Sequence, residues 1–214
     1  MTPVLVSVAF AAAATITVAA HALGRQPVVY VFKPLSTALL LLLVAAGSSV
    51  LSSRYAAAVF GGLFFSLLGD VFLMLPSDRF RSGLFCFLLA HASYVFAFLQ
   101  DSPLATPLLP FAVWIAVGSA VFRVLWPGIP RRLRLPVAAY VAILLVMAGQ
   151  ASSRAGNLHT APALQTAFGA ALFVLSDSLL AWNRFRKPFP GAQALVHASY
   201  FTAQWLIAIA ACRT

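Results

Sequence analysis

The chain has 214 residues, and its composition is that of a protein embedded in a membrane. Its mean hydropathy is +0.96, and only 8% of its residues are charged, whereas a soluble domain carries about 25%. The formal net charge is +10, but the basic residues stand in short segments between apolar runs. That pattern is typical of membrane topology, so the composition excludes a soluble domain and a nucleic-acid partner.

Eight apolar stretches are each about as long as a transmembrane helix, which needs about 20 residues. In chain order the predicted helices are residues 3–23, 28–47, 55–75, 80–99, 107–126, 134–151, 163–183 and 190–212. The first stretch ends in small residues, as a signal peptide does, but it lacks a preceding positive segment and is read as a helix. We expect an all-α, polytopic membrane protein with a single transmembrane domain over residues 1–214.

The basic residues predict the orientation of this bundle. Alternate breaks hold nine arginines and lysines, and the other breaks hold three. The nine are Arg25, Arg79, Arg81, Arg131, Arg132, Arg134, Arg184, Arg186 and Lys187, and the three are Arg54, Arg154 and Arg213. The positive-inside rule places the nine in the cytoplasm and both termini outside, in a plasma membrane of the bacterial type.

An internal repeat divides the chain into two halves, at about 1–105 and 106–214. "LLGDVFLML", "RFR" and "HASYVFAF" in the first half match "VLSDSLLAW", "RFR" and "HASYFTAQ" in the second, and "KP" at 33–34 matches "RLP" at 134–136 more weakly. Each half contains four helices, an even number, so both halves should point the same way. We therefore expect two parallel repeats related by a pseudo-two-fold axis along the membrane normal.

The repeat pairs two aspartates inside apolar segments, Asp70 and Asp177. At 1.5 Å per residue, both lie roughly 7–9 Å from the cytoplasmic ends of their helices. Each could simply pin a helix by hydrogen bonds, but an acid in a membrane segment usually marks a functional site. Two facing carboxyls, one protonated and one ionised, can act as general acid and general base through an oxocarbenium-like state.

Other polar side chains could support such a site or only join helices. His91 and Tyr94 share one helix face, and His197, Tyr200 and Gln204 share another, with His197 expected near the depth of Asp177 and His91 deeper. His21 and His159 are expected near the outer surface, without a role.

Lys33 is expected to begin the second helix, where it could reach lipid headgroups or pair with an aspartate or a substrate phosphate. Ser66 and Ser176 could orient the acids or bond to their own helix backbones, as could Ser178. Cys86 and Cys212 match no metal or disulfide pattern, and no G-x-S-x-G, phosphate loop or H-E-x-x-H is present.

The order of these short motifs resembles the YhhN-like family of membrane lysoplasmalogenases over nearly the whole chain. The matching motifs are Lys33-Pro34, Gly69-Asp70, His91 with Tyr94, Ser176-Asp177 and Tyr200. The resemblance implies hydrolysis of the vinyl ether bond of lysoplasmalogens to a fatty aldehyde and a glycerophospho-alcohol. It also implies that Asp70 and Asp177 are catalytic.

We therefore expect a membrane hydrolase that acts on a lysophospholipid-like ether with no cofactor and no metal. One alternative is a zinc-dependent lipid hydrolase like the alkaline ceramidases, with His91, His197 and the aspartates as ligands. The other is a proton-coupled transporter or a lipid-binding membrane protein in which the acids form a proton relay.

Overall fold

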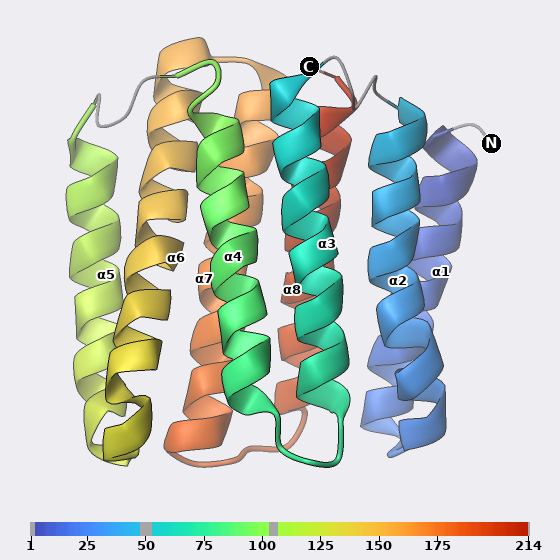
Figure 1. Ribbon diagram of the computed structural model, residues 1–214, viewed down its shortest axis with the longest axis vertical. Coiled ribbons are helices and arrows are strands. Elements are labelled where there is room, and N and C mark those ends of the chain that lie inside the picture. The colour runs from blue at the N-terminus through green and yellow to red at the C-terminus, as the bar shows by residue number, and fades with distance from the viewer. Residues whose placement is uncertain (1–2, 48–52, 103–106, 214) are drawn as a thin grey trace.

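In the computed structural model, which describes residues 3–47, 53–102 and 107–213, all regular secondary structure is helical (Figure 1). The long helices are α1 (Pro3–Ala22), α2 (Gln26–Gly47), α3 (Arg54–Met74), α4 (Phe80–Phe98), α5 (Leu109–Leu125), α6 (Arg131–Leu158), α7 (Ala161–Phe185) and α8 (Ala192–Ala211), with a 3-10 turn, η1, at Trp126–Gly128. All eight spans are long and apolar enough to cross a membrane, which confirms the prediction of eight transmembrane helices. Most of the predicted breaks "SSVLSSR" and "QDSPLATP" lies outside the described residues.

Local chemistry explains several of the helix ends. Ser53 caps α3 by accepting a hydrogen bond from the Ala56 amide at 3.2 Å, and Thr160 caps α7. Gly191 precedes α8 with a φ of +77°, a left-handed conformation that glycine adopts without steric cost.

Helix α6 is longer than the sequence predicts. The predicted range of 134–151 is wrong at both ends, because the helix runs from Arg131 to Leu158. The segment 152–158, whose polar residues suggested a loop, is helical because its side chains form hydrogen bonds with other parts of the bundle. The Arg154 guanidinium, only 1% exposed, binds Asp101 at 2.6 and 2.7 Å and Thr166 at 3.1 Å. Arg154 is therefore a buried helix residue and not a residue of an outer loop.

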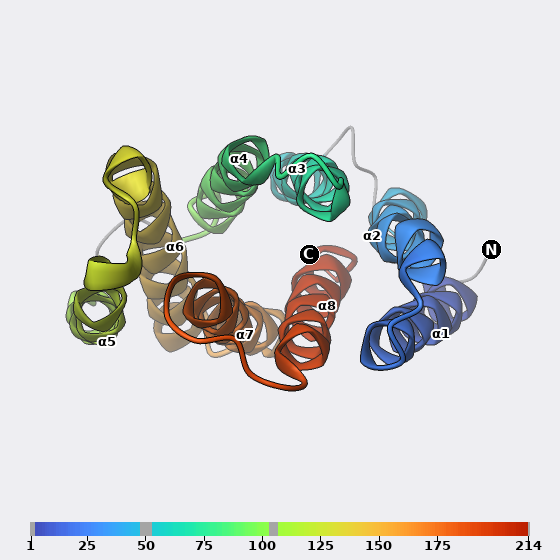
Figure 2. The ribbon, with the colours of Figure 1, turned by 90° about the horizontal axis from the view of Figure 1, so that it is seen from below.

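The helices form two facing rows with a pair of helices at each side. Seen along the helix axes, α3 and α4 make one row and α7 and α8 the other, while α1–α2 and α5–α6 flank them (Figure 2). The pairs α3–α4 and α7–α8 pack closely, as do α2–α3 and α6–α7. This order suits a parallel repeat, but the superposition of the halves, and their division at about residue 105, stay predictions.

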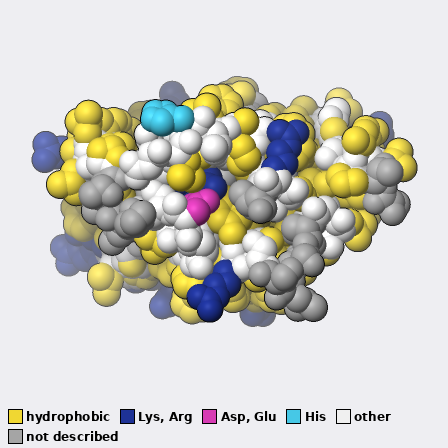
Figure 3. All heavy atoms as spheres, turned by 90° about the horizontal axis from the view of Figure 1, so that it is seen from above, with side chains coloured by type: hydrophobic (Ala, Val, Ile, Leu, Met, Phe, Trp, Pro, Cys, Tyr) yellow, Lys and Arg dark blue, Asp and Glu magenta, His cyan; other side chains and the backbone are white. Residues whose placement is uncertain are grey.

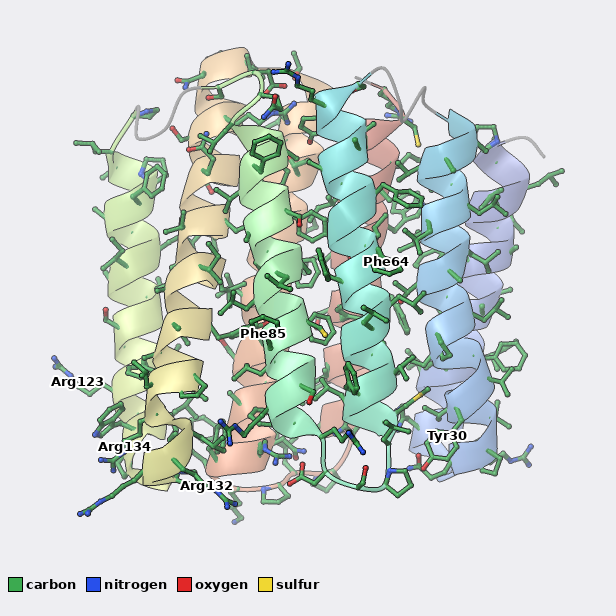
Figure 4. The ribbon with its side chains drawn as sticks, in the orientation of Figure 1. Tyr30, Phe64, Phe85, Arg123, Arg132 and Arg134 are labelled. Atoms are coloured by element: carbon green, nitrogen blue, oxygen red, sulfur yellow. The ribbon has the colours of Figure 1, made fainter. Side chains whose placement is uncertain are left out.

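Both termini lie at the same end of the bundle, and the nine basic residues lie at the other end, which we name the basic end (Figure 1). Arg123, Arg132 and Arg134 lie toward this end in Figure 4. At the opposite end, basic side chains are scattered among hydrophobic and uncharged ones (Figure 3). Which end faces the cytoplasm stays a prediction from the positive-inside rule.

Candidate active site

A cavity of about 570 Å³ lies toward the basic end, between the two rows of helices. Its volume falls in the range of about 300–1,000 Å³ that is usual for small-molecule sites. All eight helices contribute to its wall, and both Asp70 and Asp177 line it. The two membrane aspartates, which the repeat paired, thus share one cavity.

The wall of this cavity is polar at one side and apolar at the other. The polar wall, where α1, α2 and α8 meet, carries His21, Gln26, Lys33, Gln193 and His197. The apolar wall, where α5, α6 and α7 meet, is lined mainly by leucine, valine and phenylalanine side chains. They are Val121, Phe122, Leu125, Val137, Val141, Leu144, Leu145 and Val174, beside Gly118. An amphipathic molecule matches such a wall.

Asp70 is held on α3 by three donors from neighbouring helices. Lys33 Nζ on α2 lies 3.3 Å from Oδ1, while the Thr37 and Tyr200 hydroxyls each donate to Oδ2 at 2.7 Å. The aspartate is only 1% exposed, so the Lys33 ammonium supplies the counter-charge that a buried carboxylate needs. Lys33 does not begin its helix, as the sequence suggested, but lies seven residues after Gln26, inside α2.

A line of hydrogen bonds leads from Asp70 into the core. Tyr94 on α4 donates to Gln204 Oε1 at 2.6 Å, and Gln204 Nε2 donates to the Tyr200 hydroxyl at 3.1 Å. Tyr200 in turn donates to Asp70. Three residues predicted as supporting groups therefore join α4 and α8 and orient the Asp70 carboxylate.

Asp177 on α7 has a different set of neighbours. The Tyr140 hydroxyl donates to Oδ2 at 2.6 Å, and His91 Nε2 lies 2.9 Å from the Tyr140 oxygen and 3.5 Å from the carboxylate. Since Tyr140 uses its proton toward Asp177, the His91 Nε2–H must donate to the Tyr140 oxygen. The Asp177 side chain is 17% exposed and that of Asp70 only 2%, so Asp177 is the more open carboxylate.

The histidines are arranged differently from the sequence prediction. His91 contacts Asp177, whereas the His197 ring stacks on His21 with 4.4 Å between centroids. His21 is therefore not at the outer surface. It lies at the last turn of α1, on the cavity and near the basic end. The reason is chain direction, because α1 runs from the end that carries the termini toward Arg25.

The serines beside the acids serve the helices. Ser176 Oγ donates to the Val196 carbonyl at 3.0 Å and so ties α7 to α8, while Ser178 Oγ donates to the Val174 carbonyl of its own helix. Ser66 is buried one turn before Asp70 and, in the part of the chain that the structure describes, makes no hydrogen bond to it.

Two direct partners of the acids, Thr37 and Tyr140, went unnoticed in the sequence. Thr37 stands one turn after Lys33, and therefore on the same helix face. Tyr140 stands one turn after Pro136, which the weak repeat pairs with Pro34. The weak repeat around the two prolines therefore contained this information. It could have predicted that a polar residue one turn after each proline faces an aspartate.

Residues 3–47, 53–102 and 107–213 contain no group of three or more His, Cys, Asp or Glu side chains that could hold a metal ion. His91 and His197, which a zinc site would need together, point to separate partners. Two carboxylates with hydroxyl and amine donors, beside an apolar wall, can transfer protons to and from a bound amphipathic molecule.

The model of the YhhN family matches residues 28–211, so it includes both aspartates and every side chain described above as a donor to them. The chain belongs to the YhhN family. Human lysoplasmalogenase TMEM86B is 36% identical over 163 residues, which are 76% of this chain and 67% of the human protein. The pig protein of the same name is 34% identical, over 72% of this chain and 63% of the relative.

A bacterial relative matches over a larger share of its length. The membrane protein YhhN of Escherichia coli O157:H7 is 30% identical over 178 residues, which are 83% of this chain and 84% of that protein. No solved structure matches. Family membership and eight apolar spans establish an integral membrane protein of the YhhN family, similar to lysoplasmalogenases.

Proposed function

We propose that this protein hydrolyses the vinyl ether bond of lysoplasmalogens, with Asp70 and Asp177 as its acid–base pair. The observation that carries the proposal is the placement of both carboxylates on one cavity with a polar and an apolar wall. Membership of a family whose curated relatives include lysoplasmalogenases supports the same reaction.

The reaction needs one proton at carbon and one activated water. Protonation of the β-carbon of the vinyl ether by one carboxyl group gives an oxocarbenium ion. Attack of water on its α-carbon, with transfer of one water proton to the other carboxylate, gives a hemiacetal. The hemiacetal collapses to a fatty aldehyde, and the former ether oxygen leaves as the alcohol of the glycerophospho group. The balance is one vinyl ether and one water consumed, and one aldehyde and one alcohol formed.

The surroundings of the two acids suggest different roles for them. Asp70 has an ammonium and two hydroxyl donors at its oxygens, an arrangement that favours a fixed anion opposite the oxocarbenium ion. Asp177 has fewer donors and is more exposed, which suits a group that gives up and regains a proton. We therefore assign Asp177 as the general acid and Asp70 as the general base, a carboxylate that orients the attacking water and also stabilises the oxocarbenium ion.

The test is aldehyde release by the purified protein from a lysoplasmalogen in detergent. The matched control is the saturated ether lysolipid, which lacks the double bond, so protonation cannot generate the oxocarbenium ion. The proposal expects aldehyde from the first lipid only, and activity that survives a chelator. Failure to release aldehyde from any lysoplasmalogen would contradict it, and loss of activity with a chelator would favour a metal-dependent hydrolase.

A further inference from the structure

A groove of about 330 Å³ runs between α5 and α6 and borders the cavity that holds the two aspartates. Four residues line both spaces, and they are Gly118, Phe122, Val141 and Leu145. The remaining residues that line the groove are Phe111, Ile115, Ser119, Ala138, Ala142 and Val146. None of these ten residues carries a charge and Ser119 alone among them has a polar side chain, so the groove offers no counter-charge to a phosphate or an amine.

The groove extends from the depth of the site along most of α5, through the middle of the bundle and toward the end that carries the termini. Along α5 it runs from Phe122, near the basic end, to Phe111, and eleven residues span roughly 16 Å at 1.5 Å per residue. A single-chain lipid whose headgroup lies at a membrane surface directs its chain toward the midplane. A lipid headgroup at the basic end would therefore send its chain in the direction of this groove.

Helix α5 is the least enclosed of the eight spans, because only 11% of the residues in its apolar 18-residue stretch are buried. Gly118 and Leu125 are its buried residues, and Val113, Ile115 and Val117 are exposed. A lipid chain could reach the groove from the bilayer without crossing the polar wall near His197.

We propose that the groove between α5 and α6 binds the alkyl chain of the substrate, and that Gly118 and Leu145 form its entrance from the cavity. The inference rests on the proposed function and adds where the alkyl chain of the substrate lies. It agrees with the uncharged lining of the groove, with its direction and with the four residues that it shares with the cavity of the carboxylates. The polar headgroup then occupies the opposite wall, near Lys33 and His21.

At this entrance Leu145 packs directly against Gly118, which has no side chain and so leaves room for it, and an alkyl chain passes when the Leu145 side chain turns aside. A Cβ atom at position 118 would lie 2.4 Å from Leu145 Cδ1 and 2.6 Å from Cδ2, so Leu145 would have to move. The displaced side chain and the new one would then compete with an alkyl chain for the same space. Gly156, on the far end of α6, has no atom within 4 Å of its notional Cβ and provides a matched control.

The first experiment measures kcat/KM for lysoplasmalogens with short and long alkenyl chains. Gly118→Val and Leu145→Phe should lower the ratio of long-chain to short-chain kcat/KM by about tenfold, the effect of roughly one displaced methylene. Leu145→Ala, which enlarges the entrance and needs no extra room, should raise it. Gly156→Val should leave the ratio unchanged. Equal loss for both chain lengths in the folded variants, or no change in any, would overturn the inference.

A second experiment does not depend on turnover. A saturated ether lysolipid with a photoreactive diazirine at the end of its chain should crosslink to α5 and α6, at residues such as Ile115 or Ala142. Crosslinks on α1 or α8, or none, would overturn the chain site. Crosslinks on α5 and α6 in a protein that releases no aldehyde would support the groove as the binding site of the alkyl chain and would contradict the proposed function.

Discussion

Lys33 and Asp70 form a buried ion pair between α2 and α3, and removal of one charge should destabilise the protein more than removal of both. Lys33 is 7% exposed and Asp70 is 1% exposed, with 3.3 Å between Nζ and Oδ1. Lys33→Met keeps most of the side-chain stem but leaves the carboxylate without counter-charge. Breaking a buried pair in this way costs about 3–5 kcal/mol.

This cost can be expressed as a change in unfolding temperature. For a chain of this length a loss of that size lowers Tm by roughly 6–20 °C, at about 2–4 °C per kcal/mol. Replacing both partners of a buried pair is often close to neutral, so Lys33→Met/Asp70→Asn should recover most of the lost stability. The double variant should still lack activity, because the carboxylate is gone.

The assay is thermal unfolding in detergent, followed by the fluorescence of the four tryptophans. Lys187→Met is the matched control, since Lys187 is the other lysine of the chain, also precedes a proline and is exposed. Its Tm should equal that of the wild type. A wild-type Tm for Lys33→Met, or a double variant as unstable as the sum of the single changes, would refute the buried-pair reasoning.

Two further predictions concern the ends of the bundle. With Cys86 and Cys212 replaced by alanine, Arg132→Cys on the exposed start of α6 should react with a thiol reagent only from the cytoplasmic side, and labelling from outside intact cells would reverse the orientation. Asp101→Asn should lower Tm, because it leaves the buried Arg154 guanidinium without its carboxylate, while the folded protein keeps its rate of aldehyde release. Loss of activity without loss of stability would contradict that purely structural role.

The sequence was sufficient for the number of spans, because each is a long apolar run bounded by charge and turn signals. It was also sufficient to single out Asp70 and Asp177, since four aspartates are the only acids in the chain and these two recur in a repeat. It failed at the end of α6. A hydropathy argument treats Arg154 as exposed and cannot see that Asp101, fifty-three residues away, neutralises it.

The partners of the acids were harder to predict for a related reason. The repeat gives the two HASY segments the same residues, but Asp70 meets the tyrosine of the second one and Asp177 the histidine of the first. Tyr200 and His91 come from helices of the opposite half, so their pairing depends on how the halves dock. That docking results from packing across the whole bundle, which no local motif encodes.

The central claim is that Asp70 and Asp177 act together on one substrate, and the most direct measurement is aldehyde release by Asp70→Asn, Asp177→Asn and the double variant. Asparagine keeps the size of the side chain and can still accept hydrogen bonds from the hydroxyl donors, so the variants should fold. The Tm of each variant verifies this. Each single change should lower the rate by about 10²–10⁴-fold, the usual contribution of a general acid or base. The double change should cost little more, because cooperating groups are strongly non-additive. A folded single variant that releases aldehyde at the wild-type rate would contradict the account.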